Sequence, residues 1–440
     1  MLRFAPSPTG DMHIGNLRVA LMNYIVAKQK NEPFLLRIED TDKARNIEGK
    51  EREIELILEK FAITPDEKIL QSQNIKLHQK LAYRLLEEGK AFVCSCSAKD
   101  LEKAREEAKA QKKAYRYSGE CFDYGLERLE ELKSQNIPFV IRIKKPTSSI
   151  EFEDIIKGRI TTAPNEVDSF VILRADGSPT YNFACAVDDM SANITMVIRG
   201  EDHLSNTPKQ IHIQQSLGYE TQIEYAHLPI ILNSEGKKMS KRDNASSIIW
   251  LLEQGFLPDA IINYLLSLGN KTKEEIFNLP EAVEWFDLKN ISKSPAHFDI
   301  DRLRYLNREH IRRMDSKELS KIFGFADESV GNLAKLYLEE SSTIFELEGK
   351  IREIFKQKDC SKSEWQEEMK TISKIILDAP AINEFDELKK YITQESGLKG
   401  KRLFKPLRLL LTGAEHGPEL GEIYPLIKSY ILEVARCTHY

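Results

Sequence analysis

Two short polar segments, far apart in the chain, contain residues of the kinds that bind phosphate groups. The first, residues 5–16, includes His13 and Gly15 and joins an extended stretch to a helical one. A histidine at a helix start lies beside backbone N–H groups and the positive end of the helix dipole, which favour a phosphate, and Gly15 leaves room for a nucleotide. The second, residues 238–242, has three cations in five residues behind a strand-like stretch. Each alone is more commonly structural or solvent-exposed, but together they predict a polyphosphate site.

Hydrophobic spacing predicts the elements that must position these segments. The first forty residues are typical of strand, helix and strand, a βαβ unit of a parallel sheet, and the second strand ends in the acids Glu39, Asp40 and Asp42. Ligands of such sheets collect at the carboxyl ends of the strands, where both segments and the acids would lie. The expected elements are strands at 2–5, 34–38, 139–143, 194–198 and 227–232, with helices at 17–25, 77–89, 99–113 and 205–218 and mainly helix after about 245.

The overall composition is that of an ordinary multidomain protein. The 440 residues include 64 Lys and Arg against 69 Asp and Glu, for a net charge of −5, and 41% are hydrophobic. At about 150 residues per domain this predicts roughly three domains, and it excludes disordered, collagen-like and small disulfide-stapled classes. No apolar stretch approaches the ~18 residues of a membrane span, and the first residues lack a hydrophobic export signal. We therefore expect a cytoplasmic protein with no membrane partner.

The two phosphate-binding segments resemble the two signatures of the class I aminoacyl-tRNA synthetases, and they read here His13-Ile14-Gly15-Asn16 and Lys238-Met239-Ser240-Lys241-Arg242. The wider sequence resembles the glutamyl-tRNA synthetase family in particular. Asparagine at the end of the first signature is usual in this branch. The matching stretches are residues 4–10, 37–42, 179–183, 197–203, 407–408 and 411–413.

This resemblance implies an enzyme that activates L-glutamate with ATP and Mg²⁺ and then transfers it to the 3′ end of a tRNA. The partner would be tRNA-Glu, tRNA-Gln or both, because the anticodon-reading residues cannot be located in one sequence, and a monomer is expected. The fold implied is α/β with a Rossmann-like parallel sheet at residues 1–89 and 179–244. An inserted acceptor-end-binding domain at 90–178, a stem-contact helical domain at 245–305 and an all-helical anticodon-binding domain at 306–440 would complete it.

The resemblance also implies roles for individual residues. His13, Lys238 and Lys241 would be catalytic, with His13 steadying the phosphates early and Lys241 holding them in the transition state. Arg3, Ala5, Ser7, Tyr181 and Arg199 would surround glutamate, with Glu39 on its ammonium group. The nucleotide would contact Pro8, Thr9, Gly10, His13, Gly15, Asn16, Glu201, Asp202, Lys238, Met239, Ser240 and Lys241, with His203 and residues 228–232 flanking adenosine.

Chemistry agrees with an arginine in the glutamate pocket. A guanidinium forms a fork that matches a carboxylate and keeps its proton, so glutamine would leave Arg199 unpaired. A buried unmatched donor is costly, which is how such a pocket would reject the amide. The other interpretation is that Arg199 bridges to Glu201 or Asp202 at the surface.

Three cysteines have the spacing of a structural zinc site. Cys94, Cys96 and Cys121 would supply three thiolates, with Tyr117 or Asp123 as the fourth ligand. Some members of the family carry a zinc ion in the insertion and others have lost it, and free thiols in a reducing compartment are the alternative. Disulfides are not expected. The remaining cysteines, Cys185, Cys360 and Cys437, have no evident partner and are expected to be inert.

The tRNA-binding surface is expected mainly from the family. A basic segment around Phe404 gives modest support, although such clusters are more often solvated helix faces; it contains Lys399, Lys401, Arg402, Lys405 and Arg408.

Three other interpretations of the sequence are weaker. Chain length excludes the shortened relative that glutamylates a tRNA base, Arg199 and the helical carboxyl-terminal half disfavour a glutaminyl enzyme, and a catalytically inactive tRNA-binding or regulatory protein would need eroded motifs.

Overall fold

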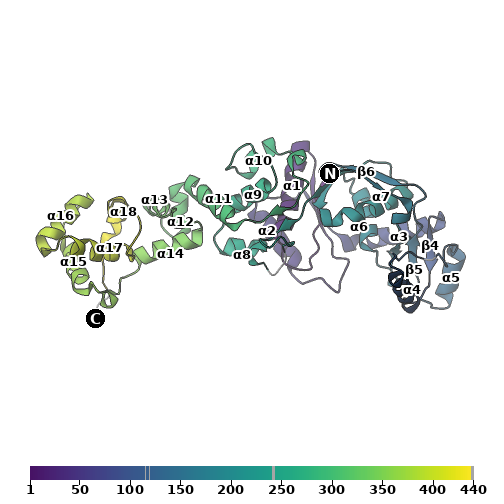
Figure 1. The fold of residues 1–440 in the computed structure, drawn as a ribbon, viewed down its shortest axis with the longest axis horizontal. Coiled ribbons are helices and arrows are strands. Elements are labelled where there is room, and N and C mark those ends of the chain that lie inside the picture. The colour runs from purple at the N-terminus through teal and green to yellow at the C-terminus, as the bar shows by residue number, and fades with distance from the viewer. Residues whose placement is uncertain (114, 118, 240–242, 438–440) are drawn as a thin grey trace. The chain divides into compact units, whose positions relative to one another are not determined.

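The computed structural model describes residues 1–113, 115–117, 119–239 and 243–437. The chain divides into two compact units, one of residues 1–248 and 265–298 and the other of residues 249–264 and 299–440 (Figure 1). The first unit is α/β and the second is helical, which confirms the predicted fold class. Among the described residues, no helix combines the length and the apolar surface that crossing a lipid bilayer would require.

A seven-stranded sheet with the order β3-β2-β1-β9-β10-β6-β7 forms the centre of the first unit. Its neighbouring strands are parallel except β6 and β7, which form an antiparallel hairpin. The chain winds outward from β1 in both directions, so β1 and β9 meet at the switch point where such sheets bind ligands. The strands are β1 (Leu2–Phe4), β2 (Phe34–Ile38), β3 (Glu67–Leu70), β6 (Ile150–Asp154), β7 (Gly158–Thr162), β9 (Met196–Gly200) and β10 (Glu224–Leu228).

One predicted strand, 227–232, is divided in the structure. β10 ends at Leu228 and a separate strand, β11 (Ile231–Leu232), follows Pro229, which has no N–H to donate to a sheet ladder. β11 pairs with β12 (Ala296–His297), a short strand in a region where the sequence pattern predicts helix. This second sheet anchors the loop that follows residue 232.

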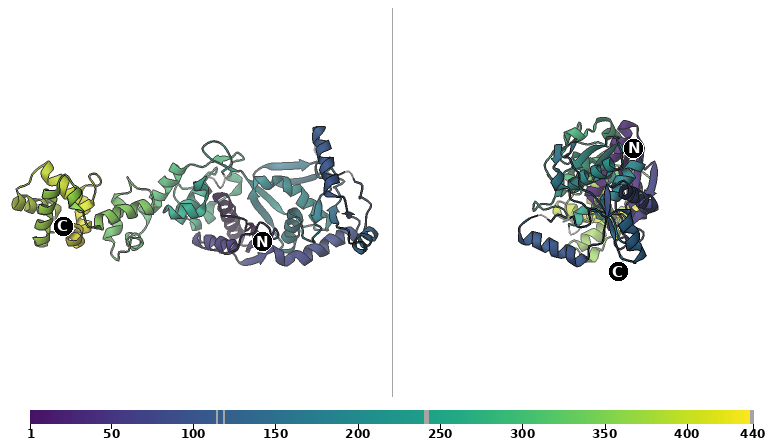
Figure 2. Two further views of the ribbon diagram at one scale, coloured as in Figure 1. Left: turned by 90° about the horizontal axis from the view of Figure 1, so that it is seen from below. Right: turned by 90° about the vertical axis from the view of Figure 1, so that its right-hand side faces the viewer.

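The residues expected to form an insertion, 90–178, contribute to two sheets. β4 (Ala91–Cys94), β5 (Val140–Ile143) and β8 (Val171–Leu173) form an antiparallel sheet of their own. The β6–β7 hairpin instead joins the large sheet, because β6 pairs with β10, a partner far along the chain that local sequence does not reveal. The charged helix α4 (Ala98–Ala110) has no buried residue and extends away from the small sheet (Figure 2).

The remaining helices of the first unit pack on or near the sheets. The predicted helix after residue 13 forms as α1, and its evenly spaced Leu17, Leu21 and Ile25 are fully buried. The helices are α1 (Ile14–Lys30), α2 (Lys50–Lys60), α3 (Ile75–Glu87), α5 (Leu126–Ser134), α6 (Tyr181–Ser191), α7 (Thr207–Ser216) and α10 (Leu279–Trp285).

A continuous cluster of buried apolar residues between Ile311 and Cys437 forms the core of most of the second unit. The expected stem-contact region, 245–305, does not form a separate unit, since parts of it belong to each of the two. The helices from 248 onward, other than α10, are α8 (Ile248–Glu253), α9 (Pro258–Ser267), α11 (Ile300–Arg313), α12 (Ser316–Ile322), α13 (Ser329–Leu336), α14 (Ile344–Phe355), α15 (Gln366–Asp378), α16 (Phe385–Ser396), α17 (Lys401–Thr412), α18 (Leu420–Ile427) and α19 (Ile431–Val434).

The prediction that Cys360 and Cys437 have no partner was wrong. They form a disulfide with a Cα–Cα separation of 5.7 Å, although 77 residues separate them in sequence. Both are buried in the core of the second unit, where the segment ending at Cys437 forms a β-bridge to Lys358. Their pairing depends on this tertiary contact, which cysteine spacing does not indicate. The other four cysteines are free.

Candidate active site

The carboxyl ends of β1 and β9 border a cavity of about 450 Å³, and a second cavity of about 250 Å³ shares part of its lining. His13 and Lys238, from the two predicted phosphate-binding segments, line the same cavity, so the fold brings the described parts of these segments together. The sequence-predicted residues in the larger lining are Arg3, Ala5, His13, Gly15, Asn16, Glu39, Tyr181, Arg199, Asp202, His203, Leu228, Pro229, Ile230, Ile231, Lys238 and Met239. Ser7, Thr9 and Gly10 line the smaller cavity.

His13 begins α1 and caps it. Its Nδ1 accepts hydrogen bonds from the backbone N–H groups of Gly15 and Asn16 at 3.1 and 3.3 Å. Because Nδ1 is an acceptor, a neutral His13 ring carries its proton on Nε2. A Cβ atom at position 15 would lie 3.0 Å from Cε1 of the His13 ring, so a larger residue there would crowd the capping ring.

The loop after β11 presents Lys238. The side-chain oxygen of Asn233 accepts hydrogen bonds from two backbone N–H groups within this loop, and the N–H of Met239 donates to the carbonyl of Ile231 at 3.0 Å. Lys238 Nζ lies 2.9 Å from Asp202 Oδ2. Burial acts to raise the pKa of Asp202, but the hydrogen bond from Lys238 and the nearby positive charges together outweigh it and lower that pKa. Ser240 and Lys241, which the resemblance places on the phosphates, lie outside the described residues.

Two buried arginines on neighbouring strands share one carboxylate. Asp189 on α6 accepts hydrogen bonds from Arg3 Nε and Nη2 at 3.1 and 3.4 Å and from Arg37 Nη1 at 2.5 Å. Arg37 Nη2 donates to Glu39 at 3.2 Å, and the Cys185 thiol donates to the same carboxylate at 3.1 Å. Although burial acts to raise the pKa of Asp189, the two guanidinium groups lower it to about 2. Burial raises the pKa of Glu39, with Arg37 opposing the shift.

Arg199 is buried and its partners are neutral. Its Nε donates to His227 Nε2 at 3.2 Å, and its Nη2 donates to the Thr207 hydroxyl at 2.7 Å. The side chain does not form a surface bridge to Glu201 or Asp202, as the other interpretation expected, because it is only 6% exposed and the described residues give it no carboxylate partner.

Tyr181 and His203 lie where the two cavities meet, with the tyrosine hydroxyl 3.1 Å from His203 Nδ1. Burial, followed by the charge of Arg199, lowers the pKa of His203 to about 4. Burial also raises the pKa of Tyr181. Both side chains are therefore neutral hydrogen-bonding groups near pH 7.

Three described residues expected at the nucleotide, Glu201, Pro8 and Leu232, lie outside both linings. Glu201 is ion-paired with Lys157 and accepts a hydrogen bond from the N–H of Ile230 at 2.9 Å. Pro8 is buried, and its carbonyl accepts a hydrogen bond from the N–H of Ile47 at 3.0 Å. Their contact with a nucleotide stays a prediction.

Sequence reasoning missed the buried polar groups behind the cavity wall. Asp189 holds Arg3 and Arg37, while His227 and Thr207 hold Arg199. The sequence did contain an indication that a partner such as Asp189 was needed. Arg37 lies inside the otherwise apolar strand 34–38, and an arginine is rarely buried without a partner. No comparable signal marks His227 or Thr207, which resemble ordinary strand-end and helix-start residues.

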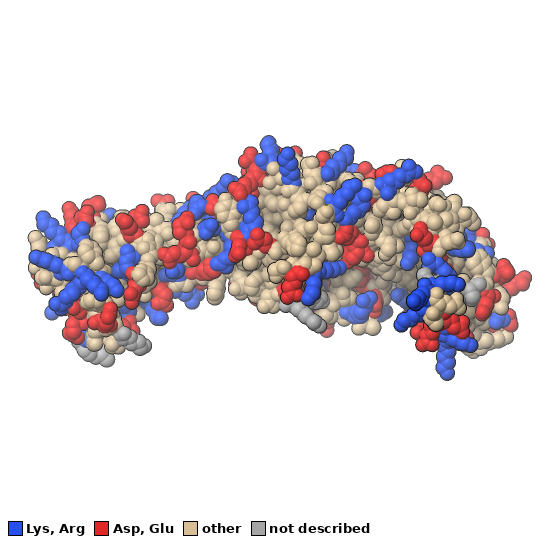
Figure 3. All heavy atoms as spheres, viewed as in Figure 1, with Lys and Arg blue, Asp and Glu red and all other residues tan. Residues whose placement is uncertain are grey.

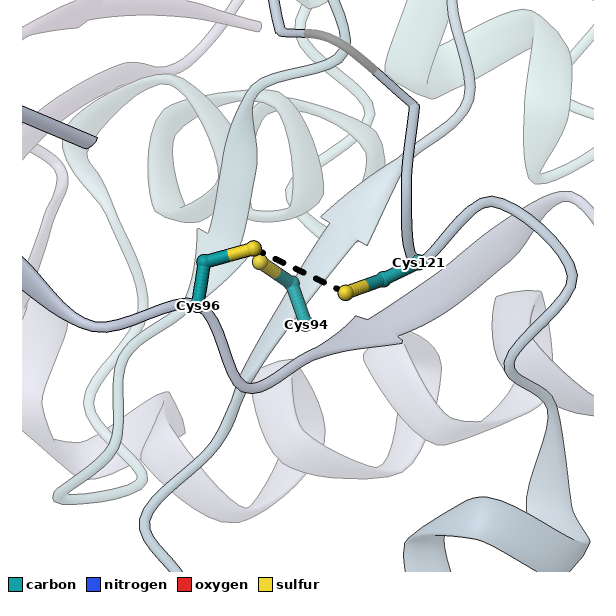
Figure 4. A group of neighbouring side chains, drawn as sticks. All are labelled: Cys94, Cys96 and Cys121. Atoms are coloured by element: carbon teal, nitrogen blue, oxygen red, sulfur yellow. Dashed lines mark hydrogen bonds between the residues drawn. The ribbon is translucent and has the colours of Figure 1, made fainter. Parts of the chain in front are cut away.

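The three cysteines of the expected zinc site lie together. The Sγ atoms of Cys94, Cys96 and Cys121 are all within 4.8 Å of one another and point toward a common centre (Figure 4). The Tyr117 hydroxyl lies 3.5 Å from Cys96 Sγ and accepts a hydrogen bond from the N–H of Cys121 at 3.2 Å. Asp123 is solvent-exposed. Three sulfurs and one oxygen around a buried centre suit a tetrahedral metal site, and of the two proposed oxygen ligands Tyr117 is the one at this centre.

Comparison with known proteins agrees with this geometry. Residues 1–305 match the model of the class I tRNA synthetase catalytic domain (E and Q), and residues 300–429 match an anticodon-binding domain. The relative named glutamate–tRNA ligase 1 from a Nitratiruptor species is 62% identical over 99% of this chain and 100% of its own length. Glutamate–tRNA ligase 2 from Sulfurimonas denitrificans is 56% identical, with the same coverage.

Solved structures show the same likeness. The crystal structure of a glutamate tRNA ligase from Elizabethkingia meningosepticum, in complex with its amino acid, is 28% identical, with a TM-score of 0.83. The alignment covers 98% of this chain and 97% of that one. With both domain models matched and relatives aligned along almost its whole length, this chain belongs to the glutamate–tRNA ligases, a family of class I aminoacyl-tRNA synthetases.

Proposed function

We propose that the two adjoining cavities are the site where L-glutamate reacts with ATP before its transfer to tRNA. The observation that carries this proposal is the convergence of His13 and Lys238 with two buried arginines, Arg3 and Arg199, in one cavity lining. A polyphosphate and a carboxylate are the anions that such donors fit. The alternative of an inactive tRNA-binding protein would require erosion of this set, which is intact in the described part of the chain.

The charge of the inner cavity suits glutamate rather than glutamine. Arg3, Arg37 and Arg199 supply three buried guanidinium groups, while Asp189 and Glu39 supply two buried carboxylates. Arg3 and Arg37 bind these carboxylates directly, whereas Arg199 has no directly bonded carboxylate among the described residues. Zwitterionic glutamate carries two carboxylates and one ammonium group, so its side-chain carboxylate would supply that partner. Neutral glutamine would leave a guanidinium buried without a counter-charge, at a cost of several kcal/mol.

The positions of these groups suggest how each end of glutamate would be held. Glu39, fixed by Arg37, would accept from the ammonium group. Arg3, Arg199 and Tyr181 would bind the side-chain carboxylate, and Ala5 and Ser7 would complete the pocket. This arrangement leaves the α-carboxylate as the nucleophile. Its oxygen would attack the α-phosphorus of ATP, and the bond to pyrophosphate would break as the new P–O bond forms.

Repulsion between a carboxylate and a triphosphate is the main barrier to this step, so we propose that electrostatic stabilisation carries the catalysis. His13 would donate a hydrogen bond from its Nε2–H group to a phosphate oxygen, and the N-terminus of α1 would add to this stabilisation. Lys238 would contribute a positive charge to the same cavity. The corresponding role of Lys241 rests on the family resemblance.

We propose that ATP reacts as its Mg²⁺ complex, in which the cation would neutralise phosphate charge. Magnesium in nucleotide sites commonly keeps several waters and takes most other ligands from the phosphates. Within the described residues, the cysteine cluster is the one group of three or more candidate metal ligands. The cavity lining thus fits an ion held mainly by the nucleotide.

We also propose one structural Zn²⁺ held by Cys94, Cys96, Cys121 and Tyr117, which would tie the end of β4 to the 117–121 loop. Metal analysis of protein purified without chelator should give about one zinc per chain. Tyr117→Phe should weaken zinc retention against a chelator, whereas Asp123→Asn should match the unmodified protein. Free thiols are the alternative, and a zinc content well below one would support it.

We propose that tRNA contacts include the basic segment at residues 399–408. Four of its cations already have partners within the protein: Arg402 pairs with Glu368, Lys405 pairs with Glu415, Lys401 lies over the Trp365 ring, and Arg408 donates to the carbonyl of Pro418. Basic and acidic side chains are interspersed on the face shown in Figure 3. We therefore expect local phosphate contacts and strongly salt-dependent binding.

The proposed partners are tRNA-Glu, tRNA-Gln or both, bound by a monomer. Aminoacylation of separate transcripts of the two tRNAs would distinguish these possibilities. Sedimentation of the free enzyme would test the monomer, and a stable dimer at working concentration would contradict it.

Arg199→Ala tests the proposed glutamate site. Removing hydrogen bonds to a charged group costs about 1.5–3 kcal/mol, so the KM for glutamate should rise about tenfold to 100-fold, with the KM for ATP nearly unchanged. Preference for glutamate over glutamine should fall in the same assay. Undiminished discrimination would rule out the role of Arg199 and, with it, this assignment of the pocket.

A further inference from the structure

Behind the cavity wall, three neighbouring strands contribute one connected series of buried polar side chains. Asp154 ends β6, His227 lies on β10 and Arg199 lies on β9, where His227 and Arg199 are direct register partners. Their exposed fractions are 3%, 0% and 6%. Polar groups enclosed this completely must satisfy one another, which restricts their geometry.

The series is anchored at Asp154. One carboxylate oxygen accepts hydrogen bonds from the N–H groups of Ile156 and Lys157, at 3.0 and 2.7 Å, in the β6–β7 turn. The other oxygen lies 2.6 Å from His227 Nδ1. Burial acts to raise the pKa of Asp154, but these hydrogen bonds, led by that from His227, outweigh it and lower that pKa. An ionised carboxylate only accepts, so His227 carries its proton on Nδ1, and its Nε2 is the acceptor that faces both Arg199 Nε at 3.2 Å and the Thr207 hydroxyl at 3.0 Å.

His227 and Thr207 together occupy one edge of the Arg199 guanidinium. The Nε–H donates to His227 and an Nη2–H donates to Thr207. The terminal Nη1–Nη2 edge is the second fork with which a guanidinium binds a carboxylate. Arg3 is held by the same Nε–Nη2 edge, and Asp189 is its partner.

Arg3 and Arg199 differ in the charge of the side chains that bind them. Asp189 is a carboxylate and cancels positive charge as it orients Arg3. The imidazole and hydroxyl that hold Arg199 are neutral, and the nearest carboxylate in this series, Asp154, stands behind His227. Arg199 is therefore oriented without a directly bonded counter-charge.

We propose that Asp154, His227 and Thr207 are positioning residues that direct the terminal edge of Arg199 at the side-chain carboxylate of the substrate while leaving its charge available. This inference rests on the proposed role of Arg199. It adds three residues that do not line the cavity but set its preference for glutamate over glutamine.

Thr207 offers the sharper test, because Val removes the hydroxyl at nearly the same volume and Ser restores it. For Thr207→Val we expect the KM for glutamate to rise about tenfold and the preference over glutamine to fall. The KM for ATP and the thermal midpoint should stay close to those of the unmodified enzyme. Thr207→Ser should lie within about twofold of that enzyme in every measurement.

A second matched pair tests His227. In His227→Gln the amide oxygen can take the place of Nε2 as acceptor for Arg199, whereas in His227→Asn the amide can only replace Nδ1, which faces Asp154. The asparagine variant should therefore lose more glutamate affinity than the glutamine variant. Arg199→Lys, measured in the same assay, is the reference for losing the paired N–H donors of the guanidinium group.

The outcomes are distinguishable. If Arg199→Lys loses glutamate affinity while Thr207→Val and His227→Asn stay within twofold, the positioning proposal is overturned and the proposed function stands. A rise in the KM for ATP equal to that for glutamate, with a lower thermal midpoint, would show a merely structural role and also overturn it. Unchanged glutamate affinity in Arg199→Lys would instead refute the proposed pocket.

Discussion

Replacing Asp189 with asparagine should be among the single changes that most reduce the stability of the first unit. The substitution keeps the size of the side chain but removes the carboxylate shared by Arg3 and Arg37, both of which are buried. Removing one partner of a buried ion pair typically costs about 3–5 kcal/mol, because the remaining charge stays desolvated. Here two guanidinium groups would be left with Glu39 as their remaining carboxylate in this cluster, so we expect a loss of about 3 kcal/mol or more.

Calorimetry would measure this loss as a lower transition temperature. A unit of this size shifts by roughly 2–4 °C per kcal/mol, which predicts a decrease of about 6–12 °C. Asp188→Asn is the matched control, because Asp188 is adjacent and equally buried but accepts from Gln71, Asn74 and His78 rather than from an arginine. The control should be less destabilised and should keep its KM for glutamate, whereas Asp189→Asn should raise it because Arg3 loses its orienting partner.

The pH dependence has a defined sign. The pKa of Asp189 is lowered to about 2 from an ordinary value of 3.8, so its contribution to stability is present above pH 4 and is lost as the pH falls toward 2. The difference in stability between the unmodified enzyme and Asp189→Asn should therefore be constant from pH 7 to pH 5. A difference that narrows within that range, or equal effects of the two substitutions, would refute the reasoning.

Three further predictions concern the disulfide and His203. Thiol titration of denatured, unreduced enzyme in the presence of a chelator should give four thiols and rise to six after reduction; six at the start would contradict the bond between Cys360 and Cys437. Since closing a loop of this length stabilises by up to about 4 kcal/mol, Cys437→Ser should lower the transition temperature of the helical unit. Because the pKa of His203 is about 4, the KM for glutamate should show no titration between pH 6 and pH 8, and a midpoint near 6.5 would contradict its neutral state.

The parts of the fold that local sequence specifies were predictable. The strand at 34–38 is observed with the predicted bounds, and the helix after residue 13 begins beside the histidine that caps it. Both signals are local: an apolar run that suits a buried parallel strand, and a side chain that satisfies the first N–H groups of a helix. The two phosphate-binding segments could likewise be placed at one edge, because parallel strands end on the same side.

The groups that support the cavity were not predictable in this way. Asp154 occupies the end of a short hairpin that local pattern assigns to the insertion, and its partner His227 lies on a strand far along the chain. Their contact exists because β6 pairs with β10, and strand order is a long-range property. Cys360 and Cys437 show the same limit, since two cysteines with unremarkable spacing meet only when the helical core forms.

The strand order also explains how this chain assembles the proposed pocket for an acidic substrate. Arg37, Arg3 and Arg199 lie on β2, β1 and β9, which are consecutive strands of the sheet although nearly two hundred residues separate the first arginine from the last. Guanidinium groups on adjacent strands would repel one another unless each were held, and α6 supplies Asp189 to two of them. The third, Arg199, is held by His227 from the next strand and by Thr207 at the start of α7. Because that support is neutral, Arg199 keeps no directly bonded counter-charge at the position where a second carboxylate would distinguish glutamate from its amide.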